Sequence, residues 1–311
     1  MKVHHSIKEF KEKKHSTILT IGTFDGVHIG HQKIIERLNQ IKSKNKDRSA
    51  ILTFFPHPRK ILNQGNEIKW LNTMDEKIQL LDKFGLDHLI IEPFTKSFSE
   101  LTALDFVNNI LVDQLFIKSL VIGYDHQFGK NREGNFEQLK EYGKIYNFDI
   151  EKITAQEIEK VSVSSTKIRI AIENGDISKA NKYLGYHYLL SGKIVKGQGL
   201  GRKLNFPTLN LHVQEEYKLI PKTGVYIVKT TIDQKIFFGI MNIGFRPTVN
   251  GKNKTIEVHL LDFTGDLYGE NMQIEVLKRL RDEQKFSGLE ELILQIKKDE
   301  LFARKWIVDQ H

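Results

Sequence analysis

The sequence predicts two domains: an α/β domain with a parallel sheet over residues 1–184, then an antiparallel β-barrel with a C-terminal helix over residues 185–311. Two observations predict this. In the first part apolar strand patterns alternate with helix patterns, which is typical of a parallel sheet covered on both faces. In the second part strand patterns follow one another through short turns, which is typical of a barrel. A length of 311 residues allows each domain its own core.

The composition is that of a globular protein, with 40% hydrophobic and 28% charged residues. Because the chain has no cysteine, disulfides and thiol chemistry are excluded, and we expect a cytoplasmic location. No apolar run is long enough for a membrane, and the charged stretch 8–14 argues against a secretory signal. The net charge of +8 comes from scattered lysines, so we expect solvated surfaces, no nucleic-acid partner and no obligate protein partner.

The first strong strand pattern, residues 17–22, runs into a glycine-rich loop and then a helix pattern over 32–42. A helix start has unpaired N–H groups and the positive end of the helix dipole, so it stabilises a bound phosphate. His28 and His31 can donate hydrogen bonds to phosphoryl oxygens during transfer at an α-phosphorus. The loop glycines, which let the backbone approach a ligand, are Gly22, Gly26 and Gly30.

Two other interpretations of His28 and His31 remain open from the residues alone. Two close histidines can bind zinc, but the chain has no cysteine and no acidic third ligand is evident. The pair can also be purely structural, although polar side chains in a glycine-rich loop between a strand and a helix seldom serve packing.

Further strands are expected at 50–55, 89–91, 119–123 and 148–153, with helices at 74–84, at 102–115 and from residue 135. Ligands of a parallel sheet bind at the carboxyl ends of its strands. Three loops lie there: Gly22–His31, the turn Pro56–Pro58 with His57 at its centre, and the segment 123–134.

A short strand at 161–163 is followed by hydroxyl side chains at a helix start. Ser164, Ser165 and Thr166 lie one turn before Arg169, which shares a helix face with Ser165. Hydroxyls and an arginine at a helix N-terminus can hold a pyrophosphate. Taken alone, the pattern favours a serine N-cap with a surface arginine; beside the histidine loop it favours the pyrophosphate site.

In the second part, strands are expected at 188–195, 224–232, 236–243, 254–262 and 271–279. Ser287 and Glu290 predict a capping box for the last helix, which can cover the barrel. After the first of these strands comes a glycine-rich basic loop, which is either a mobile hairpin or a wrap of backbone N–H groups around a triphosphate. Its residues of interest are Gly197, Gly199, Gly201 and Arg202.

Oxygen side chains follow this loop. Thr208 and Asn210 offer a hydroxyl and an amide oxygen two residues apart, which suits a Mg²⁺ ion held mostly by nucleotide phosphates. Glu257 alternates with the apolar Ile256 and Val258, and spacing alone favours a solvated outer face for it.

The first part resembles the adenylyltransferase module of bacterial FAD synthetases, a branch of the nucleotidyltransferase superfamily. Phe24–His31 resembles its His-x-Gly-His signature, Gly123–Gly129 its Gly-x-Asp-Phe-x-Phe-Gly, and Val163–Arg169 its Ser-Ser-Thr-x-x-Arg. The resemblance implies a Rossmann-like fold and assigns catalysis to His28, His31 and Arg169. It also implies nucleotide contacts for Phe24, Asp25, the loop glycines and Ser164, Ser165 and Thr166, and flavin contacts for His57, Asp125, Phe128 and Gly129. Two departures are His126 in place of a phenylalanine and Phe55 in place of an acidic residue.

The second part resembles the riboflavin kinase module, whose Pro-Thr-x-Asn motif is matched by Pro207–Asn210. The resemblance implies that Thr208 and Asn210 bind Mg²⁺ and that Glu257 is the general base toward the ribityl hydroxyl. It places Arg281 at the flavin end, and the glycine-rich loop around ATP. Asn205 replaces the usual glycine before Phe-Pro-Thr.

Together the two resemblances imply a bifunctional enzyme that converts riboflavin and ATP into FMN, and FMN and a second ATP into FAD and pyrophosphate. Two alternatives stay open. The letters His-Ile-Gly-His also head class I aminoacyl-tRNA synthetases, and Lys160–Ser164 loosely echoes their lysine-serine loop, so a tRNA-charging or tRNA-modifying enzyme is the second hypothesis. A flavin-binding protein without catalysis is the third.

Overall fold

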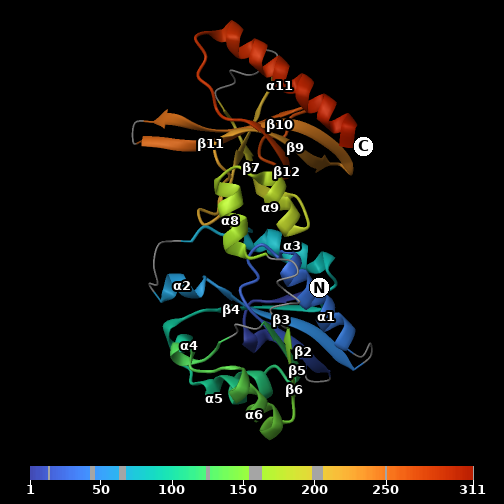
Figure 1. Cartoon of the computed structure of the whole chain (residues 1–311), viewed down its shortest axis with the longest axis vertical. Helices are drawn as coiled ribbons and strands as arrows, with labels where there is room; N and C mark the ends of the chain where they lie inside the picture. Colours follow the sequence, from blue (N-terminus) through green and yellow to red (C-terminus); the bar gives the residue numbers. More distant parts are fainter. Residues whose placement is uncertain are drawn as a thin grey trace. The chain divides into compact units, whose positions relative to one another are not determined.

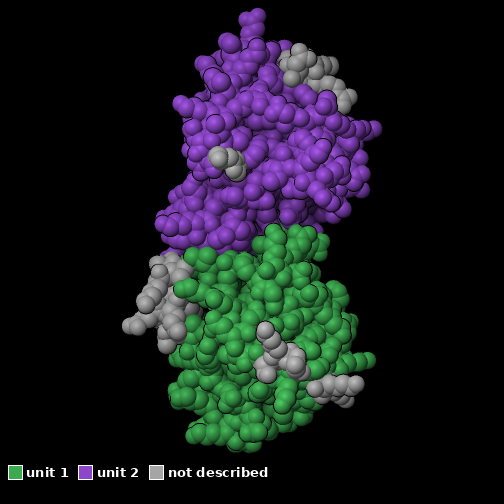
Figure 2. Space-filling model, turned by 90° about the vertical axis from the view of Figure 1, so that its right-hand side faces the viewer, with its two compact units in different colours: residues 1–68, 74–164 green, residues 69–73, 165–311 purple. Residues whose placement is uncertain are grey.

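The computed structural model describes residues 1–12, 15–42, 46–62, 68–123, 127–153, 163–197, 206–248 and 251–310. The chain divides into two compact units (Figure 2). Unit 1 comprises Met1–Ile68 and Met74–Ser164, and unit 2 comprises Lys69–Thr73 and Ser165–His311. None of the helices in these described ranges is both long and apolar enough to cross a membrane.

Unit 1 contains a six-stranded sheet in the order β1-β4-β3-β2-β5-β6 (Figure 1). All its strand pairs are parallel, which confirms the predicted α/β architecture. The short edge strand β1 was not predicted, because three residues carry no readable pattern. The strands are β1 (Lys2–His4), β2 (Ser16–Ile21), β3 (Asp47–Phe55), β4 (His88–Pro93), β5 (Ile117–Gly123) and β6 (Asp149–Ile153).

The strand order reverses at β2, which has β3 on one side and β5 on the other. In open α/β sheets this switch point is where ligands bind, outside the carboxyl ends of the strands. The loop after β2, with both histidines, therefore lies at the position that the fold favours for a ligand. The helical segments are α1 (Ile29–Ile41), α2 (Pro58–Ile61), α3 (Met74–Lys83), α4 (Lys96–Ser99), α5 (Ala103–Asp105), α6 (Phe136–Tyr146), the 3-10 turns η1 (Ile7–Glu9) and η3 (Lys130–Arg132), and the π-helical η2 (Phe106–Val112).

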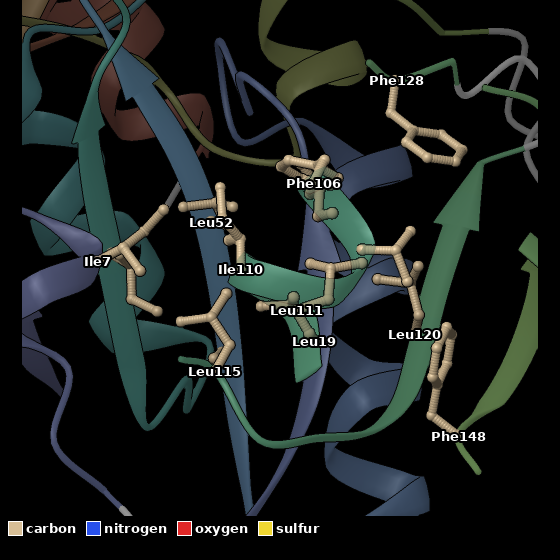
Figure 3. Packing of buried hydrophobic residues seen from close by; sticks show 14 of the residues in the cluster. Ile7, Leu19, Leu52, Phe106, Ile110, Leu111, Leu115, Leu120, Phe128 and Phe148 are labelled. Carbon is tan, nitrogen blue, oxygen red and sulfur yellow. The ribbon is translucent and has the colours of Figure 1, made fainter. Parts of the chain in front are cut away.

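A hydrophobic cluster fills one face of this sheet (Figure 3). Leu19 and Leu52 of the central strands meet Phe106 and Ile110 of η2 there. On β2 the neighbouring residue Ile18 is also fully buried, and because alternate side chains point to opposite faces it belongs to the other side. Helix α1 packs on β2 and β3. Both faces are thus covered, as a buried parallel sheet requires.

Unit 2 contains a closed barrel of six antiparallel strands in the order β10-β11-β8-β7-β12-β9. This confirms the predicted barrel, to which the structure adds the short strand β8. Alternate residues such as Ile256 and Val258 are buried. The strands are β7 (Tyr188–Val195), β8 (Leu209–His212), β9 (Gly224–Ile232), β10 (Lys235–Thr248), β11 (Gly251–Leu260) and β12 (Asn271–Arg281).

The C-terminal helix α11 (Leu289–Gln310) covers part of the outer barrel wall, where its Ala303, Trp306 and Ile307 pack with Ile227 of β9. The predicted capping partner of Ser287 was wrong by one residue. The Ser287 hydroxyl and N–H both donate to the Glu291 carboxylate, at 2.8 and 2.9 Å, instead of to Glu290. Both acidic residues lie one helical turn away, so sequence spacing does not separate them.

Two helices and the inserted segment Lys69–Thr73 complete unit 2. Helices α8 (Ser165–Glu173) and α9 (Ile177–Leu184) pack on each other, and α9 packs on β12 and β7. The Asn181 amide donates to the Val276 carbonyl at 2.9 Å. Because of these contacts the two helices belong to unit 2, and the compact units divide between residues 164 and 165. The loss of the helix pattern in the sequence placed the domain boundary later, between residues 184 and 185. That boundary stays a proposal for where the two functional modules meet.

Candidate functional site

The loop between β2 and α1 brings the two motif histidines into ring contact. His28 is the N-cap of α1, and its Nδ1 accepts a hydrogen bond from the His31 N–H at 3.4 Å. The two imidazoles stack with centroids 3.7 Å apart and 14° between their planes. Because Nδ1 of His28 accepts, the proton of the neutral ring is on Nε2, which leaves a donor for a ligand.

Burial keeps both rings uncharged. It lowers the pKa of His28 to about 4. It also lowers the pKa of His31 well below the usual 6.5, with smaller contributions from the neighbouring charges of His28 and Lys77. At pH 7 both imidazoles are therefore neutral hydrogen-bond donors and not cations.

The loop backbone is in an uncommon conformation. Phe24 and Val27 have φ values of 47° and 36°, which non-glycine residues rarely adopt. The Phe24 ring lies 4.7 Å from the His31 ring. Glycine leaves room for the rings, because a Cβ on Gly22 would come within 3.1 Å of the Phe24 ring and a Cβ on Gly30 within 3.2 Å of the His28 ring. Gly26 has φ 87°, and Asp25 is buried.

The other predicted flavin contacts of unit 1 have varied surroundings. His57 is half-buried directly after β3. Phe128 is buried in the hydrophobic cluster, with its ring 5.9 Å from that of Phe106. Gly129 has φ 73°, and a Cβ there would meet the Ala103 backbone at 2.9 Å. Asp125, with His126, lies outside the described residues.

The hydroxyl side chains of Ser164, Ser165 and Thr166 are divided between the two units. Ser164 is the last residue of unit 1, whereas Ser165 and Thr166 begin α8 in unit 2. Arg169, one turn further along α8, donates from Nε to the Lys69 carbonyl at 2.9 Å. That contact fixes one edge of the guanidinium within unit 2.

In unit 2 the structure brings several predicted site residues together on the outer barrel wall. Glu257 of β11 stands directly opposite Asn210 of β8 and, on its other side, opposite Asn242 of β10. The backbone of Gly197 lies against the Asn210 side chain, so a Cβ at residue 197 would overlap the Asn210 amide nitrogen. Gly199, Gly201, Arg202 and Asn205 lie outside the part of the chain that the structure describes.

A cavity of about 310 Å³ adjoins this row of side chains. Thr208, Glu257 and Arg281 line it, together with Asn242 and with Leu292 and Ile296 of α11. Glu257 is therefore on the outer face, as its spacing indicated, but it faces a cavity covered in part by α11. Asn242 and the residues of α11 were not found from the sequence, since no motif includes them.

Arg281 is held by an ion pair. Its Nη2 and Nε donate to the Asp299 carboxylate at 2.7 and 3.0 Å, and the Gln295 amide donates to the same carboxylate at 2.8 Å. Asp299, on α11, is nearly buried. The pair links the end of β12 to the helix that lines the cavity, a role that sequence reasoning missed.

Comparisons with known proteins agree with this architecture. A family model of FAD synthetase matches residues 10–167, and one of riboflavin kinase matches residues 184–307. Curated bifunctional riboflavin kinase/FMN adenylyltransferases are similar along the whole chain. The one from Listeria monocytogenes is 38% identical and covers 97% of this chain and 96% of the relative. The one from Buchnera aphidicola of Acyrthosiphon pisum is 37% identical and covers 98% of both chains.

The chain belongs to the bifunctional riboflavin kinase/FMN adenylyltransferase family. The family order, FAD synthetase domain before riboflavin kinase domain, matches the order of the α/β unit and the barrel. A solved structure described as a macrolide-efflux protein from Streptococcus pneumoniae has a TM-score of 0.88 at 29% identity, covering 98% of this chain and 99% of its own. The fold is thus shared over the full length.

The side chains beside the barrel cavity include oxygen donors that suit a metal ion. The Thr208 hydroxyl, the Asn210 amide oxygen and the Glu257 carboxylate come from adjacent strands or line the same cavity. One carboxylate with neutral oxygens fits Mg²⁺, which takes most of its ligands from nucleotide phosphates and water. No cluster of three or more His, Cys, Asp or Glu side chains occurs among the described residues, so the histidine pair has no third ligand of these types there.

Proposed function

We propose that the barrel of this family member transfers the γ-phosphoryl group of ATP to riboflavin, giving FMN and ADP. The α/β unit then transfers AMP from a second ATP to FMN, giving FAD and pyrophosphate. The family assignment supports both activities and their order along the chain. ATP and riboflavin are accordingly the small-molecule partners.

In the kinase reaction Glu257 accepts the proton of the ribityl hydroxyl while that oxygen forms a bond to the γ-phosphorus and ADP leaves. Thr208 and Asn210 hold Mg²⁺, which when bound neutralises phosphate charge. Arg281 acts at the flavin end, and Gly197 begins the loop that, with Gly199, Gly201 and Arg202, wraps the nucleotide. The observation that carries this assignment is the direct opposition of Glu257 and Asn210 beside a cavity.

In the adenylylation reaction the FMN phosphate is the nucleophile, so the protein needs no base. A phosphate oxygen of FMN bonds to the α-phosphorus of ATP, and the bond to pyrophosphate breaks. His28 and His31, both neutral, donate N–H groups to the oxygens on which charge develops. Ser164, Ser165 and Arg169 hold the pyrophosphate, with Thr166 beside them. Phe24, Asp25 and the glycines of the same loop contact the nucleotide, and His57, Asp125, Phe128 and Gly129 contact the flavin.

One incubation tests this proposal. The purified chain is given riboflavin, ATP and Mg²⁺, and the flavins are separated by chromatography. We expect FMN to form first and FAD to follow. Unchanged riboflavin would contradict the proposal and would leave a flavin-binding protein without catalysis as the interpretation. Specific, salt-sensitive retention of tRNA in a filter-binding assay would instead favour the tRNA-related hypothesis.

A further inference from the structure

A buried lysine outside every recognised motif contacts the histidine loop. Lys77 of α3 is fully buried, and its ammonium donates to the Thr23 carbonyl at 2.7 Å. Burial lowers its pKa to about 8, and the Asp25 carboxylate opposes that shift. The group is therefore still mostly charged at pH 7. Fully buried lysines are rare unless they are paired, so a role for the charge is expected at this position.

Lys77 binds the carbonyl of Thr23, which lies directly before the positive-φ residue Phe24. The Thr53 hydroxyl also donates to the Thr23 carbonyl, at 3.3 Å. Two donors on one carbonyl fix the orientation of the Thr23–Phe24 peptide. The next residue, Phe24, has φ 47°, a conformation that persists only where its surroundings enforce it.

Ring contacts connect this peptide to the histidines. The Phe24 ring lies 4.7 Å from the His31 ring, which in turn stacks on His28 at 3.7 Å. A displaced Thr23–Phe24 peptide would therefore move the Phe24 ring and release His31 from its contact. Geometry at a reacting phosphorus is demanding, and a shift of about 1 Å can cost about 100-fold in rate.

We propose that Lys77 is a positioning residue of the adenylylation site, which holds the Thr23 carbonyl and through Phe24 sets the places of His31 and His28. The inference rests on the proposed adenylyltransferase function. Lys77 binds the loop backbone and acts through it, so its effect is expected on kcat more than on the KM for ATP or FMN.

The test compares Lys77→Met with Lys83→Met in the full-length chain. Lys83 lies on the same helix but is exposed, so it controls for the loss of a lysine from α3. FMN adenylylation is measured with supplied FMN, riboflavin phosphorylation is measured on the same preparations, and the His31 ring is titrated by NMR. For Lys77→Met we expect a kcat for adenylylation about 10- to 100-fold lower. Kinase activity should be unchanged, and Lys83→Met should behave as wild type.

The titration is a second readout, on the His31 ring itself. Burial is the main cause of the lowered pKa of His31 and the charge of Lys77 lowers it further, so removing Lys77 should raise that pKa. Thr53→Val removes the other donor to the Thr23 carbonyl and should lower the kcat for adenylylation about three- to tenfold. If Lys77→Met does not fold, this variant tests whether the orientation of that carbonyl matters for the rate. A wild-type kcat in the folded variants overturns the inference. If the wild-type chain does not adenylylate FMN, the proposed function fails instead, and the titration alone still tests whether Lys77 acts on His31.

Discussion

Glu257 and Asn210 are directly opposite each other on the antiparallel strands β11 and β8. Side chains at opposed positions project from the same face of a sheet, with Cβ atoms about 4.5 to 5.5 Å apart. The proposed base, which lines the cavity on the barrel wall, and one proposed Mg²⁺ ligand are therefore neighbours on adjacent strands. Strand pairing, and not a flexible loop, sets the distance between them.

Replacing Glu257 by Gln should stop riboflavin phosphorylation and leave adenylylation of supplied FMN intact. The amide keeps the size of the side chain but cannot accept the ribityl proton, and general-base catalysis contributes about 10²- to 10⁴-fold. Initial rates of FMN formation measure the effect, with Glu270→Gln on the exposed loop before β12 as the control. A normal kinase rate in Glu257→Gln would remove Glu257 from the role of base.

Replacing Gly197 by Ala should impair the kinase through Asn210. The new Cβ would overlap the Asn210 amide, so that side chain must leave its present position. We expect a decrease in kinase kcat and a higher Mg²⁺ requirement, measured by rate against Mg²⁺ concentration. Gly288→Ala is the matched control, because a Cβ there meets nothing within 4 Å. Equal Mg²⁺ dependence in both variants would contradict a metal-binding role for Asn210.

Replacing Asp299 by Asn should loosen α11 over the cavity. The change removes the carboxylate that pairs with Arg281, and breaking a largely buried pair of this kind costs roughly 1 to 3 kcal/mol. The KM for riboflavin should rise, and hydrogen exchange in α11 should become faster. Asp309→Asn, at an exposed position of the same helix, should change neither. Unchanged exchange in Asp299→Asn would show that the pair does not hold the helix.

Acid should destabilise unit 1 through a second histidine pair. His4 Nε2 and His88 Nδ1 are 3.0 Å apart and both rings are buried. Burial lowers the pKa of His4, and it lowers that of His88 from 6.5 to about 4. Since the folded state binds the proton more weakly than the unfolded chain, the stabilisation is complete above pH 6.5 and is lost as the pH falls toward 4.

Hydrogen-exchange protection factors of β4 at pH 7 and pH 5 measure this loss of stability. The double variant His4→Phe/His88→Phe should show a smaller difference between the two pH values than the wild type. His5→Asn, at an exposed position, is the control and should retain the full difference. An undiminished acid effect in the double variant would assign it to other groups, of which His28 and His31 are the first candidates.

Much of the fold could be predicted, because the spacing of apolar residues indicates strands and helices and their order along the chain indicates the fold class. Buried strands such as β2 are short and rich in apolar and β-branched residues. A strand, a glycine-rich loop and a helix in succession identify an anion site. The position of His28 and His31 at the start of α1 followed from that succession alone. The alternation of Glu257 with buried residues also predicted its outward orientation correctly.

Features that depend on distant segments could not be predicted. The outward face of Glu257 borders a cavity only because α11, far along the chain, covers that wall. Lys77 binds a backbone carbonyl of the loop between β2 and α1, and the segments α1, β3 and α2 separate that loop from α3 in the sequence. A contact to a carbonyl has no sequence signature. Likewise, the packing of Phe128 on Phe106 joins segments that no motif connects in the sequence.

The most direct test of two separate active sites mixes two defective variants. His31→Ala should make FMN from riboflavin but no FAD, because the donor to the α-phosphoryl oxygens is lost, and His5→Ala should make both. Glu257→Gln should make neither product from riboflavin. When His31→Ala and Glu257→Gln are combined with riboflavin, ATP and Mg²⁺, we expect chromatography to show FAD, since FMN released by one chain is adenylylated by the other. Accumulation of FMN without any FAD in the mixture would contradict two independently acting sites.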